Sequence, residues 1–330
     1  MIIVLILLFI GLIILWFINK KNSSVERTKK INYLDSNITI HLYHQDKKSA
    51  EEVIDKIKKI FKKYDTLSDR YNPKENVKNL YYIIYNNSKD NTITIDKTLY
   101  EMLEYSKKWY QKSNGKIDVS LASVSEIWKM YRDSTTGVPS PEELKRARIH
   151  TMEDIVLLEN NQIKNNHVDI DLEDIAKSFA MKEITNYLKQ KNISEYLIDI
   201  NGDAFMGKHY QNKTYKIALQ NPDEKNDIYE IVQGNNINVV TTGNHQLYYE
   251  YNQIRYHHIL DSNTLMPANY IKSITIITKD IKDSYILSKM LFLMPFDQSK
   301  QYVEQTKGLE AIWYVDSDNI IKSSNFSKYE

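Results

Sequence analysis

Hydrophobic and polar residues along the chain recur with two periods, one typical of strands and one typical of helices. Apolar side chains at alternate positions predict half-buried strands, because successive residues of a strand face opposite sides. Apolar side chains three and four positions apart predict amphipathic helices. On this basis we expect strands at 38–42, 91–96, 196–200, 215–219, 271–278 and 311–315, and helices at 99–109, 175–188 and 284–294 and from Ser49 onward.

A further helix is expected after Ser140. The sequence Ser140-Pro141-Glu142-Glu143 places a capping hydroxyl three residues before a glutamate, with a proline at the first helical position. Strands and helices are interspersed without strict alternation, and we find no tandem repeat or low-complexity linker in the sequence. These features predict a single α+β body with mixed α and β layers.

The first residues form an apolar segment unlike the rest of the chain. Residues 2–18 carry no charge and are mostly aliphatic, with Trp16 near one end. This length is the short limit for a membrane-spanning helix, and the segment lacks a signal-peptide cleavage site. We predict an anchor in the lipid bilayer of the cell membrane at 1–19, a basic tether at 20–31 and a globular body at 32–330. The lysine and arginine residues after the anchor favour a cytoplasmic body by the positive-inside rule.

Composition and charge exclude several classes of site. The net charge is +1, with 44 basic and 43 acidic residues, so we expect no nucleic-acid partner. The chain has no cysteine, which excludes disulfides, thiolate metal sites and a cysteine nucleophile. Tyrosine is abundant at 25 residues, and most of these rings are expected to pack within the body rather than stack on a ligand.

The segment 241–267 carries the most specific pattern in the chain. It reads TTGNHQLYYEYNQIRYHHILDSNTLMP and resembles the TSGdYer…yHHIIDPxTGxP signature of the ApbE family, the FAD:protein FMN transferases. Other segments resemble further motifs of this family, in the same order along the chain: LSDRYNPKENVKNL at 67–80, NGKIDVSLASVSEIW at 114–128, DLEDIAKSFAMK at 171–182, LIDINGDAFMG at 197–207 and DSYILSKMLFLMP at 283–295.

The resemblance implies the fold and the activity of that family, an ApbE-like mixed α/β layered domain. Its members split FAD at the pyrophosphate and attach FMN to a threonine hydroxyl of another protein, with release of AMP. FAD as substrate, Mg²⁺ and an acceptor protein bearing a target threonine are therefore implied. Many members act outside the cytoplasm, which disagrees with the charge rule, so the side of the membrane on which the body lies stays open.

The resemblance also assigns roles to residues by position. The match to the family's HIID makes His258 the expected base for the threonine proton, and Asp261 the residue that orients its ring. The adjacent His257 is expected on the opposite face of the strand, with a structural role. The expected flavin-nucleotide contacts are Asp118, Lys177, Asp203, Thr241, Thr242, Gly243 and Ile259.

The chain departs from the family pattern where the pyrophosphate and the metal are expected. Glu173 and Asp174 replace a glycine pair at a helix start, and their charges repel a pyrophosphate unless a cation lies between. Tyr285 and Lys289 replace the Asp and Thr that supply metal ligands, and neither suits magnesium. Asp174 is then the remaining candidate metal ligand. If Lys289 reaches this site, it is expected to pair with Asp174 and close the pocket. A two-residue slip would restore Asp283 as a ligand, but it breaks the hydrophobic register.

Two interpretations follow from these departures. The chain is either a membrane-anchored FAD:protein FMN transferase or a catalytically degenerate relative that keeps the fold and binds a partner at the membrane. The turn after the histidines departs as well, because Leu265 stands where the family has glycine, and a positive φ there would be strained. Loss of a metal that stabilises developing charge would cost several kcal/mol of barrier.

Overall fold

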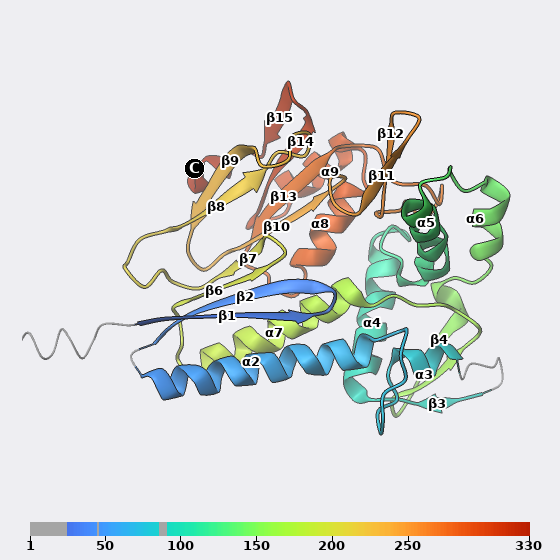
Figure 1. Cartoon of the computed structure of the whole chain (residues 1–330), viewed down its shortest axis with the longest axis horizontal. Coiled ribbons are helices and arrows are strands. Elements are labelled where there is room, and N and C mark those ends of the chain that lie inside the picture. Colours follow the sequence, from blue (N-terminus) through green and yellow to red (C-terminus); the bar gives the residue numbers. More distant parts are fainter. Residues whose placement is uncertain (1–24, 45, 86–90) are drawn as a thin grey trace, which may run out of the picture.

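The computed structural model describes residues 25–44, 46–85 and 91–330, and within them eight antiparallel strands form a central sheet (Figure 1). In spatial order the strands are β1 (Val25–Tyr33), β2 (Ser36–His44), β6 (Tyr196–Ile200), β7 (Asp203–Met206), β10 (Asn238–Gly243), β13 (Ser273–Thr278), β14 (Leu309–Asp316) and β15 (Asn319–Lys322). All six residues of β13 are buried. A strand buried along its whole length needs cover on both faces of the sheet, and other elements provide it.

Helices cover one face of the sheet. They are α2 (Lys47–Ser68), α4 (Lys97–Lys112), α7 (Glu173–Gln190), α8 (Ser284–Phe292) and α9 (Phe296–Gln305). Figure 1 shows α2 and α7 side by side beneath β1 and β2, and α8 packs on β10 and β13. The apolar stripe of α2, including Ile57, Ile60 and Phe61, is fully buried in this layer. The largest hydrophobic cluster of the described residues therefore lies between these helices and the sheet.

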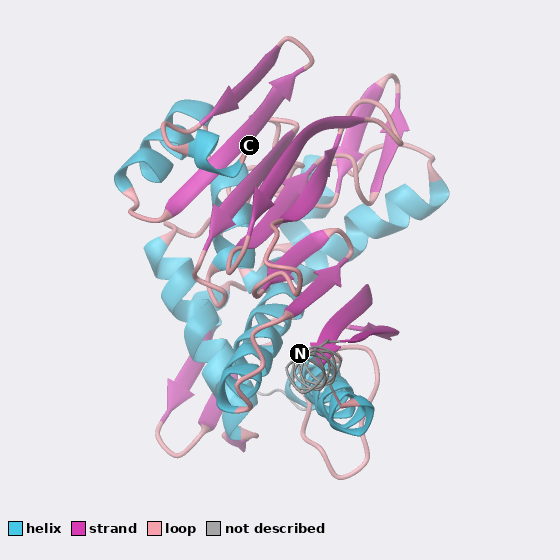
Figure 2. Cartoon of the chain, turned by 90° about the vertical axis from the view of Figure 1, so that its left-hand side faces the viewer, coloured by secondary structure: helices cyan, strands magenta, loops and turns pink. Residues whose placement is uncertain are grey.

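The hairpin β8 (Tyr215–Gln220) and β9 (Ile228–Gly234) covers the other face. Adjacent residues of β14 divide between the two layers, since Trp313 packs on the helical side and Ile312 on the hairpin side. Val232 and Phe326 complete the second cluster from β9 and the C-terminal turn η3 (Phe326–Tyr329). In Figure 2 the strands run through the middle of the molecule with helices beside them, which is the predicted layered α+β arrangement.

Smaller elements lie around α4 and complete the fold. They are η1 (Val119–Leu121), α5 (Ala122–Ser134), α6 (Pro141–Ala147), the hairpin β11 (Tyr248–Tyr251) and β12 (Ile254–His257), α3 (Leu80–Tyr85), η2 (Met152–Asp154), and a sheet of β3 (Ile93–Thr94), β5 (Gln162–Asn165) and β4 (Ile155–Leu158). A third cluster joins Trp128 of α5 and Leu144 of α6 to Tyr249 of β11. It fixes the β11–β12 hairpin against α5, and so it fixes the segment that carries the two histidines.

Most predicted elements are confirmed, and two need correction. The helix expected from Ser49 begins at Lys47, because Asp46 rather than Ser49 is the capping residue and accepts the Ser49 N–H. The strand expected at 91–96 is only two residues long. The helix after Ser140 begins as predicted, with the Ser140 hydroxyl accepting the Glu143 N–H.

The predicted anchor at 1–19 lies outside the described residues. In the part of the chain that the structure describes, no helix is long and apolar enough to cross a bilayer. Residues 25–31, predicted to belong to the basic tether, form most of β1 and pair with β2, with Ile31 opposite Ile38. This strand was missed because it lies at the edge of the sheet, where charged side chains such as Lys29 and Lys30 stay exposed.

Candidate active site

A cavity of ≈ 450 Å³ lies where α7, α8, η1 and the carboxyl ends of β10 and β12 meet. This volume is in the range of small-molecule sites. Nine of the ten residues predicted for the site line it, and Asp261 does not: the nine are Asp118, Asp174, Lys177, Asp203, Thr241, Thr242, Gly243, His258 and Ile259. Segments far apart in sequence therefore meet at one cavity, as the order of the motifs predicted.

The amino end of α7 supplies charged groups to the cavity. The Asp171 carboxylate accepts the Glu173 N–H at 3.0 Å and starts the helix. One turn later the Lys177 Nζ lies 2.5 Å from Glu173 Oε1, and its side chain is only 10% exposed. Burial lowers the pKa of Lys177, but the carboxylates of Glu173 and Asp174 outweigh burial and raise it. Lys177 is therefore charged and held against its own helix.

Helix α8 faces the cavity with Tyr285 and Lys289. The Lys289 Nζ lies 2.8 Å from Asp174 Oδ2, so the expected contact is confirmed, yet the cavity stays open. Burial lowers the pKa of Lys289, but Asp174 outweighs it and raises the pKa above its usual value. Asp283 does not line the cavity and instead accepts the Tyr105 hydroxyl at 2.5 Å. Tyr285 and Lys289, and not Asp283, are thus among the residues of α8 that face the cavity.

The hydroxyl of Tyr285 is buried and has no hydrogen-bond partner among the described residues. The side chain lines the cavity, and the residue is 7% exposed. Burial, together with the nearby Asp203 and Asp174 carboxylates, raises the pKa of Tyr285 well above its usual value, so the hydroxyl keeps its proton. A buried donor without a partner is unfavourable, and such groups are often satisfied by a ligand or ordered water.

Residues of strand β10 and the first residue of β7 line another side of the cavity. Thr241 N–H donates to Asp203 Oδ1 at 2.8 Å, and the Thr242 hydroxyl lies 2.7 Å from the Ser288 hydroxyl of α8. Burial raises the pKa of Asp203 to about 7. At Gly243 a Cβ atom would approach His245 Nδ1 to 2.6 Å, so a larger residue would force a shift there. These contacts fix β10 against α8 at the site.

The two histidines differ in the way that strand alternation predicts. His257 is buried, and both of its ring nitrogens have backbone partners: Nε2 donates to Ala268 O at 2.7 Å and Nδ1 accepts the Ile259 N–H at 3.2 Å. His258 faces the cavity, and its Nδ1 donates to Gln246 O at 3.2 Å because a carbonyl can only accept. This tautomer leaves Nε2 as an acceptor. Desolvation in the cavity and the charge of Lys289 lower the pKa of His258, which favours the neutral ring.

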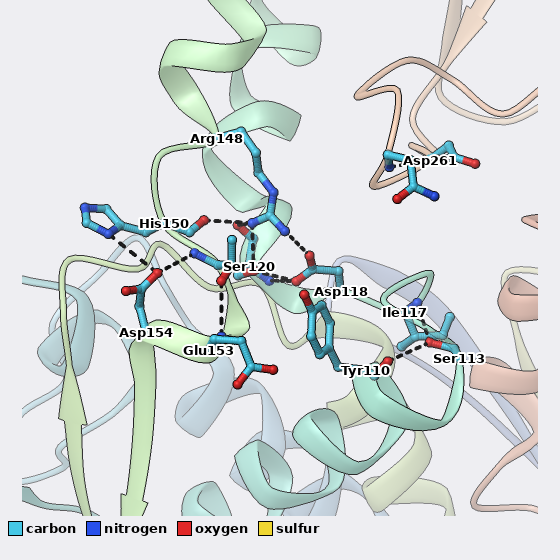
Figure 3. Close-up of polar contacts among 12 residues, drawn as sticks. Tyr110, Ser113, Ile117, Asp118, Ser120, Arg148, His150, Glu153, Asp154 and Asp261 are labelled. Carbon is cyan, nitrogen blue, oxygen red and sulfur yellow. Dashed lines mark hydrogen bonds and ion pairs between the residues drawn. The ribbon is translucent and has the colours of Figure 1, made fainter.

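Asp261 holds its own turn instead of the His258 ring. Its Oδ1 accepts the Asn263 N–H at 2.8 Å and the Thr264 N–H at 3.4 Å. The residue is 5% exposed and is not among the residues that line the cavity, and Figure 3 shows it apart from Asp118 and Arg148. The structure shows no contact between this carboxylate and His258 within the described residues. The orienting role expected for Asp261 therefore needs correction: the Gln246 carbonyl is the partner of His258.

The turn after the histidines keeps a left-handed residue without a glycine. Leu265 has φ 60°, donates its N–H to Asp261 O at 2.8 Å and accepts the Trp128 indole N–H at 2.9 Å. A left-handed leucine costs about 1–2 kcal/mol. Burial of the Leu265 side chain in the cluster around Trp128 offsets that cost. Leu265 therefore has the strained positive φ that was expected, and the packing of its side chain compensates for the strain.

The ion pair between Arg148 and Asp118 lies beside η1 and was not predicted from the sequence (Figure 3). Arg148 pairs with Asp118, whose other oxygen accepts the Ser120 N–H at 2.9 Å. The Asp118 side chain is 0% exposed. Arg148 also donates to His150 O at 2.7 Å. Asp118 thus caps η1 and shapes the wall, and no signal at a separation of 30 residues identified its partner.

Arg70 is a second basic residue at the cavity that was not assigned a role. It lies in the quoted segment 67–80, so the signal for it was present. Its guanidinium is 9% exposed and donates to Asp169 at 2.6 Å and to Glu126 at 2.8 Å. These two carboxylates therefore fix the position of the Arg70 guanidinium in the lining of the cavity.

A magnesium ion does not fit the residues present. Asp174, the remaining candidate ligand, is already paired with Lys289. The other cavity-facing groups of α8 are an ammonium and a protonated phenol, which are hydrogen-bond donors rather than ligands. Within 25–44, 46–85 and 91–330, no group of three or more His, Asp or Glu is arranged to hold a metal ion.

Comparison with known proteins places the chain among flavin transferases. It is 25% identical over 256 residues to the FAD:protein FMN transferase of Haemophilus influenzae, covering 73% of this chain and 74% of that protein. It is 24% identical over 252 residues to that of Treponema pallidum, covering 70% and 69%.

Solved structures show the same fold. The ApbE protein of Thermotoga maritima superposes with a TM-score of 0.81 at 21% identity, covering 93% of this chain and 99% of that one. The flavin transferase ApbE of Vibrio cholerae gives 0.76 at 18% identity, covering 93% and 100%. A sequence model of the ApbE family matches residues 34–313, and the chain therefore belongs to the ApbE family.

Proposed function

We infer that this protein is an FAD:protein FMN transferase that uses FAD as the flavin donor and a second protein as the acceptor. The named relatives carry this activity, and they match about seven-tenths of the chain. The observation that carries the inference is the cavity, which joins two charged lysines to a neutral histidine with a free acceptor nitrogen. Phosphoryl chemistry needs both an anion site and a proton acceptor.

The reaction follows from these groups. The acceptor hydroxyl oxygen forms a bond to the phosphorus of the FMN half, and the bond from that phosphorus to the bridging oxygen breaks. AMP leaves with that oxygen, and the hydroxyl proton moves to His258 Nε2. Because Gln246 O fixes the proton on Nδ1, the lone pair of Nε2 is available at the cavity wall. A threonine hydroxyl is the proposed acceptor group.

The remaining residues position the nucleotide. Lys177 and Lys289 offset the charge of the pyrophosphate. The absence of a side chain at Gly243 lets the His245 ring pack against the backbone of β10 beside the cavity. Membrane anchoring through residues 2–18 stays a prediction, as does the side on which the body lies.

The ion pair between Asp174 and Lys289 is the observation that favours the second candidate, a degenerate binding protein. In that case the pair is a remnant that blocks metal-assisted chemistry. The open cavity and the free Nε2 of His258 favour catalysis instead.

The test is to incubate the full chain with FAD and candidate acceptor domains, each paired with a Thr→Val variant of its target. Covalent flavin fluorescence on the acceptor in a denaturing gel, lost with the Thr→Val variant, supports the transferase. FAD that binds but is never cleaved supports the degenerate alternative. FAD that does not bind contradicts the proposed function.

A further inference from the structure

We propose that in this protein a lysine ammonium replaces the divalent cation: Lys289 and the Tyr285 hydroxyl bind the pyrophosphate oxygens of the nucleotide directly. The inference rests on the proposed function, because the anion is taken to be the pyrophosphate of FAD. It predicts a flavin transferase whose nucleotide binding needs no metal.

The first argument is the type of group that α8 presents. Tyr285 and Lys289 are four residues apart, lie on one face of the helix and both line the cavity. Each is a hydrogen-bond donor, and the phenol keeps its proton because its pKa is raised. Carboxylates on this face would need a metal between themselves and a phosphate, whereas donors contact phosphate oxygens without one.

The second argument is that both groups have unused capacity. The Lys289 ammonium has three N–H groups, and Asp174 is its one hydrogen-bond partner in the described part of the chain. Its side chain is 38% exposed, so a ligand in the cavity can reach it. The Tyr285 hydroxyl is buried, and among the described residues it has no hydrogen-bond partner, so its donor is available to a ligand in the cavity.

The third argument is the role left for Asp174. A carboxylate at the start of α7 repels a pyrophosphate, and its contact with Lys289 holds the ammonium in place at the cavity wall. Asp174 is therefore a positioning residue. As a metal ligand it would strengthen nucleotide binding, whereas as a positioning acid it contributes repulsion. The two roles predict opposite effects of removing its charge.

The experiment measures FAD affinity of the full chain by flavin fluorescence, in EDTA and in millimolar MgCl2. Equal dissociation constants, within about twofold, are expected in the two buffers. Asp174→Asn should bind FAD several-fold more tightly in EDTA. Lys289→Met should weaken binding roughly 10- to 100-fold, the loss of one or two charge-assisted hydrogen bonds.

Two further variants separate a direct contact from net charge. The double variant Asp174→Asn with Lys289→Met keeps the net charge of the wild type, and weaker FAD binding than wild type is expected because the donor is gone. The double variant Tyr285→Asp with Lys289→Thr restores oxygen ligands and should make FAD binding dependent on Mg²⁺. Its Mn²⁺ electron paramagnetic resonance spectrum should show a bound ion that the wild type lacks.

The outcomes are distinct. FAD binding by the wild type that tightens tenfold or more with Mg²⁺ overturns this inference and leaves the proposed function standing. Weaker binding by Asp174→Asn in the presence of Mg²⁺ also overturns it. Absence of FAD binding in both buffers overturns the inference and the proposed function together.

Discussion

Two acid–base pairs each contribute a carboxylate to the lining of the cavity, and they are built differently. In the pair between Asp118 and Arg148 the carboxylate is 0% and the guanidinium 13% exposed, and serine and backbone groups satisfy the remaining hydrogen bonds. In the pair between Asp174 and Lys289 the side chains are 34% and 38% exposed and share one contact. The first pair is closed to a ligand, and the second can exchange its partner.

This difference separates structure from function at the site. A buried and fully hydrogen-bonded pair strongly resists the loss of one partner. A half-buried pair with a single contact contributes less to folding, so its ammonium can turn toward an incoming anion at lower cost. The pair between Asp118 and Arg148 therefore maintains the shape of the cavity. The pair between Asp174 and Lys289, on α7 and α8, is available to bind the nucleotide.

The largest effect on activity is expected at His258, which lines the cavity together with Asp174 and Lys289. His258→Gln should lower the rate of FMN transfer by about 10²–10⁴-fold, because the proton acceptor is lost. FAD affinity should change by less than about threefold, since the ring is not needed to hold the nucleotide. Single-turnover transfer and fluorescence titration measure the two quantities. A variant that transfers FMN at the wild-type rate would show that another group takes the proton.

The next effect tests the closed pair. Arg148→Met leaves the buried Asp118 carboxylate without its cation and should lower the free energy of unfolding by about 3–5 kcal/mol. Lys289→Met is the matched control on the other wall, where less than about 1 kcal/mol is expected. Urea unfolding followed by tryptophan fluorescence measures both. Equal losses in the two variants would remove the distinction between the pairs.

A pH effect of intermediate size is expected at Asp203. Burial raises its pKa from 3.8 to about 7, so the folded protein holds a proton that the unfolded chain releases. The free energy of unfolding should therefore fall as the pH rises from about 4 to about 7, by up to roughly 4 kcal/mol from this group. Asp203→Asn should flatten the dependence in urea titrations at several pH values. An unchanged slope in that variant would assign the effect to other groups.

The smallest effect is expected at Tyr285. Tyr285→Phe removes a buried hydroxyl that has no partner in the described part of the chain, so the protein without ligand should gain up to about 1 kcal/mol of stability. FAD binding should weaken by about 5- to 10-fold, because one donor to the pyrophosphate is lost. Thermal unfolding with and without FAD measures both changes. A loss of stability without ligand would mean that the hydroxyl already has a partner.

The sequence predicted the site better than it predicted the contacts within it. Lys177, Thr242 and His258 were assigned by motifs whose order requires them to meet, and all three line the cavity. Hydrogen-bond partners depend on turn geometry that no motif records. Asp261 was therefore assigned to the histidine ring, although it closes its own turn.

Partners from distant segments were the hardest to predict. Arg148 pairs with Asp118 across 30 residues that contain two helices, and no periodicity connects them. In contrast, the reach of Lys289 to Asp174 was expected, since both positions match motifs of one family site. The strand β1 was missed for another reason, because its exposed charged face hides the alternation that marks a strand.

The most direct test of the account is a crystal structure of the FAD complex grown with MnCl2, with data collected at the manganese edge. The account predicts the Lys289 Nζ within hydrogen-bond distance of a pyrophosphate oxygen and no anomalous peak in the cavity. A manganese peak between Asp174 and the pyrophosphate, with Lys289 turned away, would contradict it.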